Sequence, residues 1–150
     1  MIKILPMKIS DIDDVLIIEE LCFNVPWRYN DFEKEINNNN MAIYKVAFDD
    51  NKNKILGYAG MWHIVTEGHI TNIAVHPDYR RNGIGTLLVQ EMIKCAKEKN
   101  MLGITLEVRI SNITAQKLYT KYGFRPEGFR KNYYTEPKED AVIMWKYFSY

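Results

Sequence analysis

Apolar side chains recur along this chain with two periods, one close to two residues and one close to 3.6. Runs rich in β-branched and aromatic residues, bounded by turn residues, predict strands, whereas apolar positions three and four residues apart predict helices. The predicted strands are 2–5, 41–48, 54–65, 69–75 and 103–109, with two more within about 125–148. The predicted helices run from near Ser10 to Cys22, from Asn30 to the asparagines at 37–40, from 84 to 98 and from 112 to 124.

The order of these elements, β-α-α-β-β-β-α-β-α-β-β, predicts a single α/β domain over residues 1–150. The polar segment 49–53 joins two strands as a hairpin, which makes the first part of the sheet antiparallel. The strand–helix–strand unit around helix 84–98 predicts a parallel pair of strands with a right-handed crossover. We therefore expect a mixed sheet.

The composition is that of a globular protein, with 47% apolar and 13% aromatic residues. The formal net charge is only +1, from 20 basic and 19 acidic residues. General nucleic-acid binders usually carry a large basic excess, so this balance argues against direct binding to nucleic acid. Any phosphate site must be local.

The cysteines and histidines match no metal-ligand spacing, so no metal site is predicted. Cys22 and Cys95 both fall within helical patterns and are read as buried free thiols. The three histidines are read as structural or exposed residues; they are His63, His69 and His76.

The first ten residues lack the apolar core of a signal peptide. No apolar run approaches the ~20 residues that a membrane span requires. The sequence therefore predicts a cytoplasmic protein that does not bind a membrane.

One short segment, "HPDYRRNGIGTLL" (76–88), points to a ligand. Gly83 and Gly85 stand where a helix begins, so their backbone N–H groups can approach an anion closely, and Arg80 and Arg81 add full positive charges. The segment lacks the GK[ST] ending of a P-loop and the third glycine of a dinucleotide-binding fingerprint. Its spacing is R-x-x-G-x-G after a strand, which favours a phosphate or pyrophosphate site over a turn with two solvated arginines.

The segment "NIAVHPDYRRNGIGTLL" (72–88) resembles the acetyl-CoA-binding segment of the GNAT N-acetyltransferases, and "LEVRISNITAQKLYTKYGF" (106–124) resembles the second half of the same fold. The pieces "LEVR", "YGF", "RKNYY" and "EDAVIM" are similar to the branch that acetylates the alanine of a ribosomal protein (the RimI branch). The resemblance implies a mostly antiparallel sheet in which one parallel strand pair splays apart to hold acetyl-CoA.

Acetyl-CoA, used as a co-substrate without a metal, is the small molecule that the resemblance implies. Strand backbone would bind the pantetheine arm, and the glycine turn would bind the pyrophosphate. The implied contacts are Ile73, Ala74, Val75, Arg80, Arg81, Asn82, Gly83, Ile84, Gly85, Thr86, Asn112 and Tyr119.

Two residues are the candidates for acid–base chemistry. Glu107 alternates with Leu106 and Val108 along its strand, so it can face the ligand and act as general base, directly or through a water. The alternative is a surface glutamate paired with Arg109 or a lysine. The resemblance implies that Tyr119 is the general acid for the departing thiolate; the alternatives are a tyrosine packed in the core, or Tyr122 in that role.

The acceptor amine is less well defined by the sequence. The resemblance implies a channel between the segments 23–30 and 130–140, and the N-terminal alanine of the eighteenth small-subunit ribosomal protein as acceptor. An α-amine loses its proton more easily than a lysine, which favours an Nα-acetyltransferase. Broader protein acetylation, acetylation of a small amine and a non-catalytic acetyl-CoA-binding module stay open, and a monomer or weak dimer is expected. The candidate substrate contacts are Phe23, Pro26, Trp27, Asn72, Tyr133 and Tyr134.

Overall fold

The computed structural model describes all residues from Met1 to Tyr150 and contains seven strands and four α-helices. The strands are β1 (Ile2–Pro6), β2 (Ala42–Asp49), β3 (Lys54–Ile64), β4 (Glu67–Val75), β5 (Gly103–Arg109), β6 (Arg125–Thr135) and β7 (Lys138–Tyr147). The helices are α1 (Ile12–Cys22), α2 (Tyr29–Asn37), α3 (Ile84–Glu98) and α4 (Ile113–Lys121), with 3₁₀ turns η1 (Ile9–Asp11) and η2 (Pro77–Tyr79). The predicted order of strands and α-helices is confirmed.

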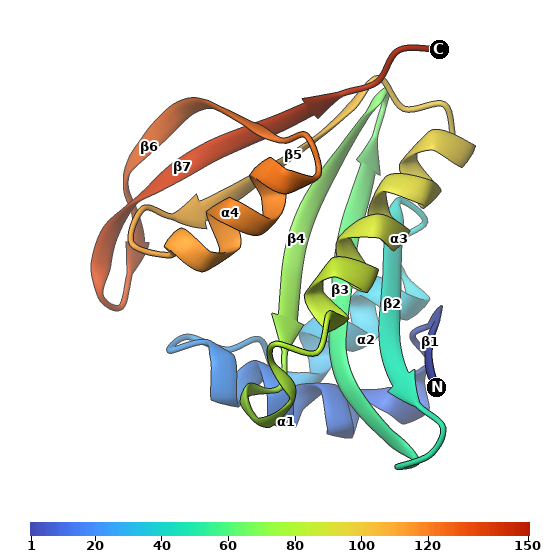
Figure 1. Cartoon of the computed structure of the whole chain (residues 1–150). Coiled ribbons are helices and arrows are strands. Elements are labelled where there is room, and N and C mark those ends of the chain that lie inside the picture. Colours follow the sequence, from blue (N-terminus) through green and yellow to red (C-terminus); the bar gives the residue numbers. More distant parts are fainter.

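The seven strands form one mixed sheet in the order β1-β2-β3-β4-β5-β7-β6. Every neighbouring pair is antiparallel except β4 and β5, which are parallel. These two strands pair only from Glu67 opposite Gly103 to His69 opposite Thr105, and beyond that point they diverge (Figure 1). The expected splayed parallel pair is therefore present, and it divides the sheet into two halves joined at one end.

The helices cover both faces of the sheet, α3 and α4 on one face and α1 and α2 on the other (Figure 1). The helices pack on the sheet through two buried apolar clusters, one on each face. One includes Leu88 and Met92 of α3, and the other includes Val15 of α1 and Phe32 of α2. Burying one such side chain stabilises the fold by about 1.5–3 kcal/mol, so these faces fix the helices on the sheet.

The last hairpin differs from its prediction. Residues 130–135 were expected in a loop, but β6 continues to Thr135, and only Glu136 and Pro137 separate it from β7. Antiparallel pairing with β7, from Arg125 opposite Trp145 to Thr135 opposite Lys138, draws this polar segment into the sheet. Tyr133 and Tyr134 are therefore carried by a strand.

None of the helices combines the length and the apolar character that crossing a membrane requires. Both cysteines are free, as expected; Cys95 is buried, but Cys22 is only half-buried.

Candidate active site

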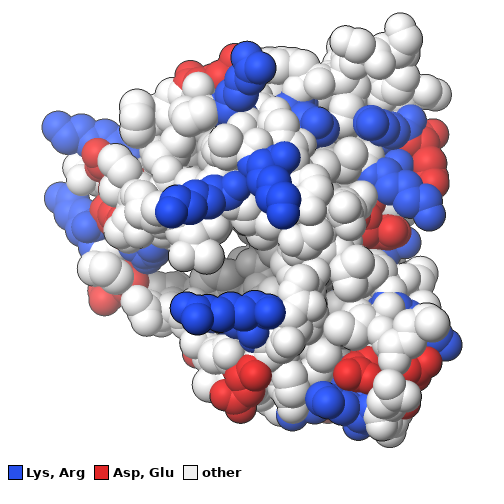
Figure 2. Space-filling view, in the orientation of Figure 1, with Lys and Arg blue, Asp and Glu red and all other residues white.

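The divergence of β4 and β5 opens a cleft of about 590 Å³ in the middle of the molecule. Figure 2 shows a hollow in this face, with basic side chains along both of its sides. In the orientation shared with Figure 1, they belong to α4 on one side and to the turn before α3 on the other. The predicted site residues that line the cleft are Phe23, Trp27, Asn72, Ile73, Glu107, Asn112, Tyr119, Tyr133 and Tyr134.

The edge of β4 that faces the split presents backbone groups that β5 does not reach. His76 N–H donates to the Leu56 carbonyl on β3, and antiparallel pairs alternate, so Ala74 also faces β3 while Ile73 and Val75 face the split. Of the three predicted pantetheine contacts on β4, Ala74 is therefore the one whose backbone N–H and carbonyl point away from the cleft. The Val75 carbonyl accepts hydrogen bonds from Arg80 Nε at 3.3 Å and from the Cys22 thiol at 3.4 Å.

The glycine turn forms the start of α3, as the sequence predicts. Gly83 is the N-cap residue in the left-handed region, with φ of 76°, and a Cβ built there would meet no other atom within 4 Å. The N-terminus of α3 is therefore open to a ligand at this residue. Gly85 has a different use, because a Cβ there would lie 3.3 Å from a methyl carbon of Leu118 on α4. It permits the close approach of the two helices.

The remaining residues of the turn divide into structural and exposed groups. Ile84, the first residue of α3, is buried in the core, and the Asn82 side chain donates to the Tyr79 carbonyl at 3.0 Å, which stabilises the turn. Arg80 and Arg81 are exposed. The half-buried Thr86 follows in the first turn of α3. None of residues 80–86 is part of the cleft lining, so the turn lies beside the cleft rather than in its wall.

Glu107 lies deep in the cleft, and its side chain is only 7% exposed. Its Oε2 atom is 2.7 Å from His69 Nε2, and its Oε1 accepts a hydrogen bond from Arg130 Nε at 3.1 Å. The contact with His69, followed by the contact with Arg130, holds the pKa of the Glu107 carboxyl below its ordinary value. Glu107 therefore remains a carboxylate at neutral pH. The alternative in which Glu107 pairs with Arg109 is not formed, because Arg109 binds Glu139 at 3.0 Å.

Tyr119 is buried against Phe124, at a ring-centroid distance of 5.8 Å, and lines the cleft. Its hydroxyl makes no hydrogen bond within the protein, yet no fully enclosed side-chain polar atom lacks a partner. The hydroxyl therefore faces the cleft. Burial raises the pKa of Tyr119 to about 12, so the phenol stays protonated. Tyr122, the competing candidate, does not line the cleft.

Asn112 holds the start of α4 at the edge of the cleft. Its side-chain oxygen accepts the Ala115 N–H at 3.1 Å, which is the predicted N-cap. The cap fixes the helix that carries Tyr119, and Asn112 itself lines the cleft. One residue thus positions the helix and remains available to a ligand.

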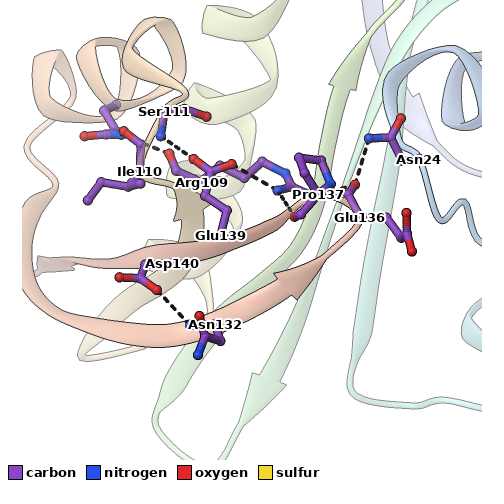
Figure 3. A network of polar contacts seen from close by, with 10 residues as sticks. Asn24, Arg109, Ile110, Ser111, Asn132, Glu136, Pro137, Glu139 and Asp140 are labelled. Carbon is purple, nitrogen blue, oxygen red and sulfur yellow. Dashed lines mark hydrogen bonds and ion pairs between the residues drawn. The ribbon is translucent and has the colours of Figure 1, made fainter.

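The two segments expected to wall an acceptor channel touch each other at the rim of the cleft. Asn24, in the loop between α1 and α2, donates from Nδ2 to the Glu136 carbonyl at 2.7 Å (Figure 3). Arg109 of β5 donates to the same carbonyl at 3.1 Å and to the Pro137 carbonyl at 2.9 Å. Its guanidinium also lies 4.2 Å from the ring centroid of Tyr134. The turn between β6 and β7 is thus held from two sides.

The aromatic candidates differ in how free they are to contact a substrate. Tyr133 is exposed. Trp27 packs on Phe32 at 5.2 Å, and its backbone N–H donates to the buried Glu19 carboxylate at 2.9 Å. Trp27 is therefore part of the core as well as of the cleft wall, and Pro26 next to it does not line the cleft.

Three residues of this site had no assigned role in the sequence: Glu19, Asn24 and Arg130. A fourth, His69, was read only as structural or exposed, but it lines the cleft and contacts Glu107. His69 and Glu107 meet because of the register between β4 and β5, which the chain pattern does not give. The one available signal for His69 was its position in a strand that ends at the predicted ligand-binding turn. No group of three or more His, Cys, Asp or Glu side chains is arranged to hold a metal ion.

Comparison with known proteins assigns the family. The model of the acetyltransferase (GNAT) family matches residues 12–124, which is most of the chain. The candidate ribosomal protein bS18-alanine N-acetyltransferase of Bacillus subtilis (strain 168) is 43% identical over 139 residues, covering 93% of this chain and 91% of that protein. The ribosomal protein bS18-alanine N-acetyltransferase of Haemophilus influenzae is 36% identical over 137 residues, covering 89% and 90%.

The fold leads to the same group of proteins. The crystal structure of the ribosomal-protein-S18-alanine N-acetyltransferase from Escherichia coli matches with a TM-score of 0.90 and 30% identity, covering 100% of this chain and 96% of that chain. The similarity in sequence to these relatives, and in structure to the Escherichia coli protein, extends over nearly the full length of each chain. This chain therefore belongs to the acetyltransferase (GNAT) family and is an N-acetyltransferase.

Proposed function

We propose that this protein transfers an acetyl group from acetyl-CoA to the N-terminal alanine of ribosomal protein bS18. The observation that carries the mechanism is that Glu107 and Tyr119, a carboxylate and a free phenol, line one cleft at the split between β4 and β5. The names of the relatives support the acceptor. Such a reaction belongs where ribosomes are assembled, so the proposal carries the expectation of a cytoplasmic enzyme.

The residues around the split fit acetyl-CoA in two ways. The Gly83 N-cap is open, and an α-helix N-terminus with Arg80 and Arg81 beside it suits a pyrophosphate. The β4 edge at Ile73 and at the Val75 N–H can pair with the amides of a pantetheine arm, as a neighbouring strand would; the Val75 carbonyl already accepts from Arg80 and Cys22. Acetyl-CoA supplies the thioester carbonyl carbon that the acceptor amine attacks.

Glu107 acts as the general base in this proposal. An amine must lose a proton before its nitrogen can attack, and a carboxylate in the cleft, directly or through a water, can take that proton. Its lowered pKa keeps Glu107 ionised and ready to accept, although it also makes the carboxylate a weak base. An α-amine, with an ordinary pKa near 8, suits such a base better than a lysine near 10.4.

Tyr119 acts on the leaving thiolate. Its pKa of about 12 lies well above the ordinary pKa of a thiol, about 8.5, so complete proton transfer to sulfur costs roughly 4–5 kcal/mol. A protonated phenol can still donate a hydrogen bond to the sulfur as negative charge develops there. Tyr119 is therefore a stabilising donor first and a proton source second.

Mass spectrometry of a bS18 N-terminal peptide incubated with acetyl-CoA tests the proposed function. We expect one acetyl group on the terminal alanine. If the peptide stays unmodified while a polyamine or an aminoglycoside is acetylated in parallel reactions, the proposed acceptor is excluded. The assignment as an acetyltransferase then still stands.

Replacing Gly83 with alanine is expected to weaken acetyl-CoA binding by about tenfold, or ~1.4 kcal/mol. The added methyl group would occupy the open space in front of the α3 N-terminus, and φ of 76° disfavours any Cβ. Isothermal titration calorimetry measures the change in affinity.

Gly123 offers a control for the backbone strain, because it is also left-handed, with φ of 96°, but follows the C-terminus of α4 and does not cap the start of α3. Gly123→Ala should lower the free energy of unfolding about as much as Gly83→Ala does, and it should leave the affinity for acetyl-CoA unchanged. Equal loss of affinity in both variants would mean that Gly83 acts through stability alone.

Replacing Asn24 with alanine is expected to raise the peptide KM by roughly two- to tenfold with kcat almost unchanged. The change removes the hydrogen bond to the Glu136 carbonyl that joins the two walls of the acceptor channel. Neither Asn24 nor Glu136 is hydrogen-bonded to Glu107 or Tyr119, so the reacting groups should keep their places. Steady-state kinetics with varied peptide measures the effect, and a fall in kcat at constant KM would contradict it.

A further inference from the structure

The side chain of His69 lines the same cleft as Glu107 and Tyr119 and contacts Glu107 directly. His69 is the last residue of β4 that pairs with β5, and it lies opposite Thr105. Glu107 lies two residues beyond Thr105, on the same side of its strand. The register of the parallel pair therefore brings the imidazole and the carboxylate together at the point where the sheet opens.

Both oxygens of the Glu107 carboxylate have a basic partner, His69 on one and Arg130 on the other. These two partners differ in one respect that matters for proton transfer. A guanidinium stays protonated in proteins, so Arg130 can hold the negative charge but cannot carry a proton away. An imidazole can both accept and release a proton near neutral pH. Of the two, only His69 can relay a proton.

The surroundings of His69 connect the cleft with solvent. Its side chain is 31% exposed, whereas that of Glu107 is 7% exposed. The Trp62 ring of β3 lies edge-on to the imidazole at 6.5 Å, and Glu35 of α2 accepts the Trp62 indole N–H at 2.8 Å. Arg130, Tyr133 and Tyr134 of β6 are further charged and titratable groups near the pair.

We propose that His69 is a positioning residue that orients the Glu107 carboxylate and receives from it the proton given up by the acceptor amine. The inference rests on the proposed function, in which Glu107 is the base. The N–H bond of the ammonium breaks as an O–H bond forms on Glu107. That proton then forms an N–H bond at His69 Nε2, Glu107 returns to a carboxylate, and the imidazolium releases its Nδ1 proton to solvent. Each turnover thus leaves Glu107 as a carboxylate and His69 as a neutral imidazole in its Nε2–H form, and exchange of the ring protons with solvent restores the Nδ1–H form that accepts the next proton.

The test is the pH dependence of kcat for peptide acetylation in the wild type and in His69→Gln. Glutamine can still donate a hydrogen bond to Glu107 but cannot carry a proton. We expect kcat to fall about tenfold at pH 7.5, with unchanged acetyl-CoA affinity. We also expect the variant to lose the acid limb of the wild-type pH profile, because glutamine, unlike an imidazole, cannot exchange a proton with Glu107. Added imidazole should restore part of kcat in His69→Ala.

His63→Gln is the matched control, because His63 lies on β3 opposite Gly68 and outside the lining of the cleft. Its kcat and pH profile should equal those of the wild type. A wild-type rate and acid limb in His69→Gln, together with an inactive Glu107→Gln, would overturn the inference and leave the proposed base intact. Full activity of Glu107→Gln would instead remove the base on which the inference depends.

Discussion

Glu107→Gln is expected to lower kcat by about 100-fold or more while acetyl-CoA binds with almost unchanged affinity. Glutamine keeps the size of the side chain and removes its capacity to accept a proton. The carboxylate is buried between His69 and Arg130, with its pKa held below the ordinary value, so the wild type has this acceptor ionised throughout the neutral range. Stopped-time assays from pH 6 to 9, with calorimetry of acetyl-CoA, measure both quantities.

Two further variants help to interpret the fall in kcat that is expected for Glu107→Gln. Glu127→Gln makes the same chemical change at an exposed residue of β6 that bonds Tyr147, and it should leave kcat unchanged. Tyr119→Phe should lower kcat by about tenfold, which is a smaller fall than that of Glu107→Gln. The reason is that a phenol with a pKa near 12 is a poor proton donor to a thiolate. Near-normal turnover of Glu107→Gln at every pH would assign proton removal to another group or to bulk water.

The sequence predicted the fold well because its local signals agree with one another. The β2–β3 hairpin was readable from the polar segment between two β-rich runs, and the start of α3 from Gly83 and the arginines before it. The parallel pair followed from the crossover through α3, and the resemblance to the GNAT fold supplied its divergence. The structure confirms this arrangement, including the single parallel pairing in a mostly antiparallel sheet.

The candidate site was only partly predictable, because several of its contacts join residues far apart in the chain. Asn24 and Glu136 are separated by 112 positions, and no periodicity relates them. The contact between His69 and Glu107 depends on strand register, which is set by packing and not by either strand alone. The extension of β6 to Thr135 was missed because the polar residues 130–132 interrupt the strand pattern. The tyrosines and threonine after them favour a strand, and pairing with β7 resumes at Tyr134.

The catalytic roles of Glu107 and Tyr119 stay predictions, although their positions agree with those roles. Both were named from strand or helix position and from the resemblance, and both line the cleft. The structure also changes the view of Trp27, whose packing on Phe32 makes truncation a change to the core. Asn24 and the exposed Tyr133 are therefore the better positions for probing the acceptor channel.

A peptide that begins with free alanine is expected to be acetylated about 100-fold faster than the same peptide with a blocked N-terminus and one internal lysine. The difference between ordinary pKa values of about 8 and 10.4 is worth roughly 3 kcal/mol at neutral pH, and Glu107 is too weak a base to offset it. Shape adds to this preference. The hydrogen bond from Asn24 to Glu136 closes the rim between the two walls, so a chain end can enter where a lysine with two flanking segments meets the bridge.

The measurement is mass spectrometry of both peptides after equal incubation, repeated with Asn24→Ala. Opening the rim should narrow the difference between the peptides, because the variant removes the steric part of the preference and leaves the part due to pKa. Asn51→Ala, in the turn between β2 and β3, is the matched control and should keep the wild-type ratio. Preferential acetylation of the internal lysine by the wild type would exclude N-terminal selectivity, since both the proton affinity of the amine and the width of the channel predict the opposite order.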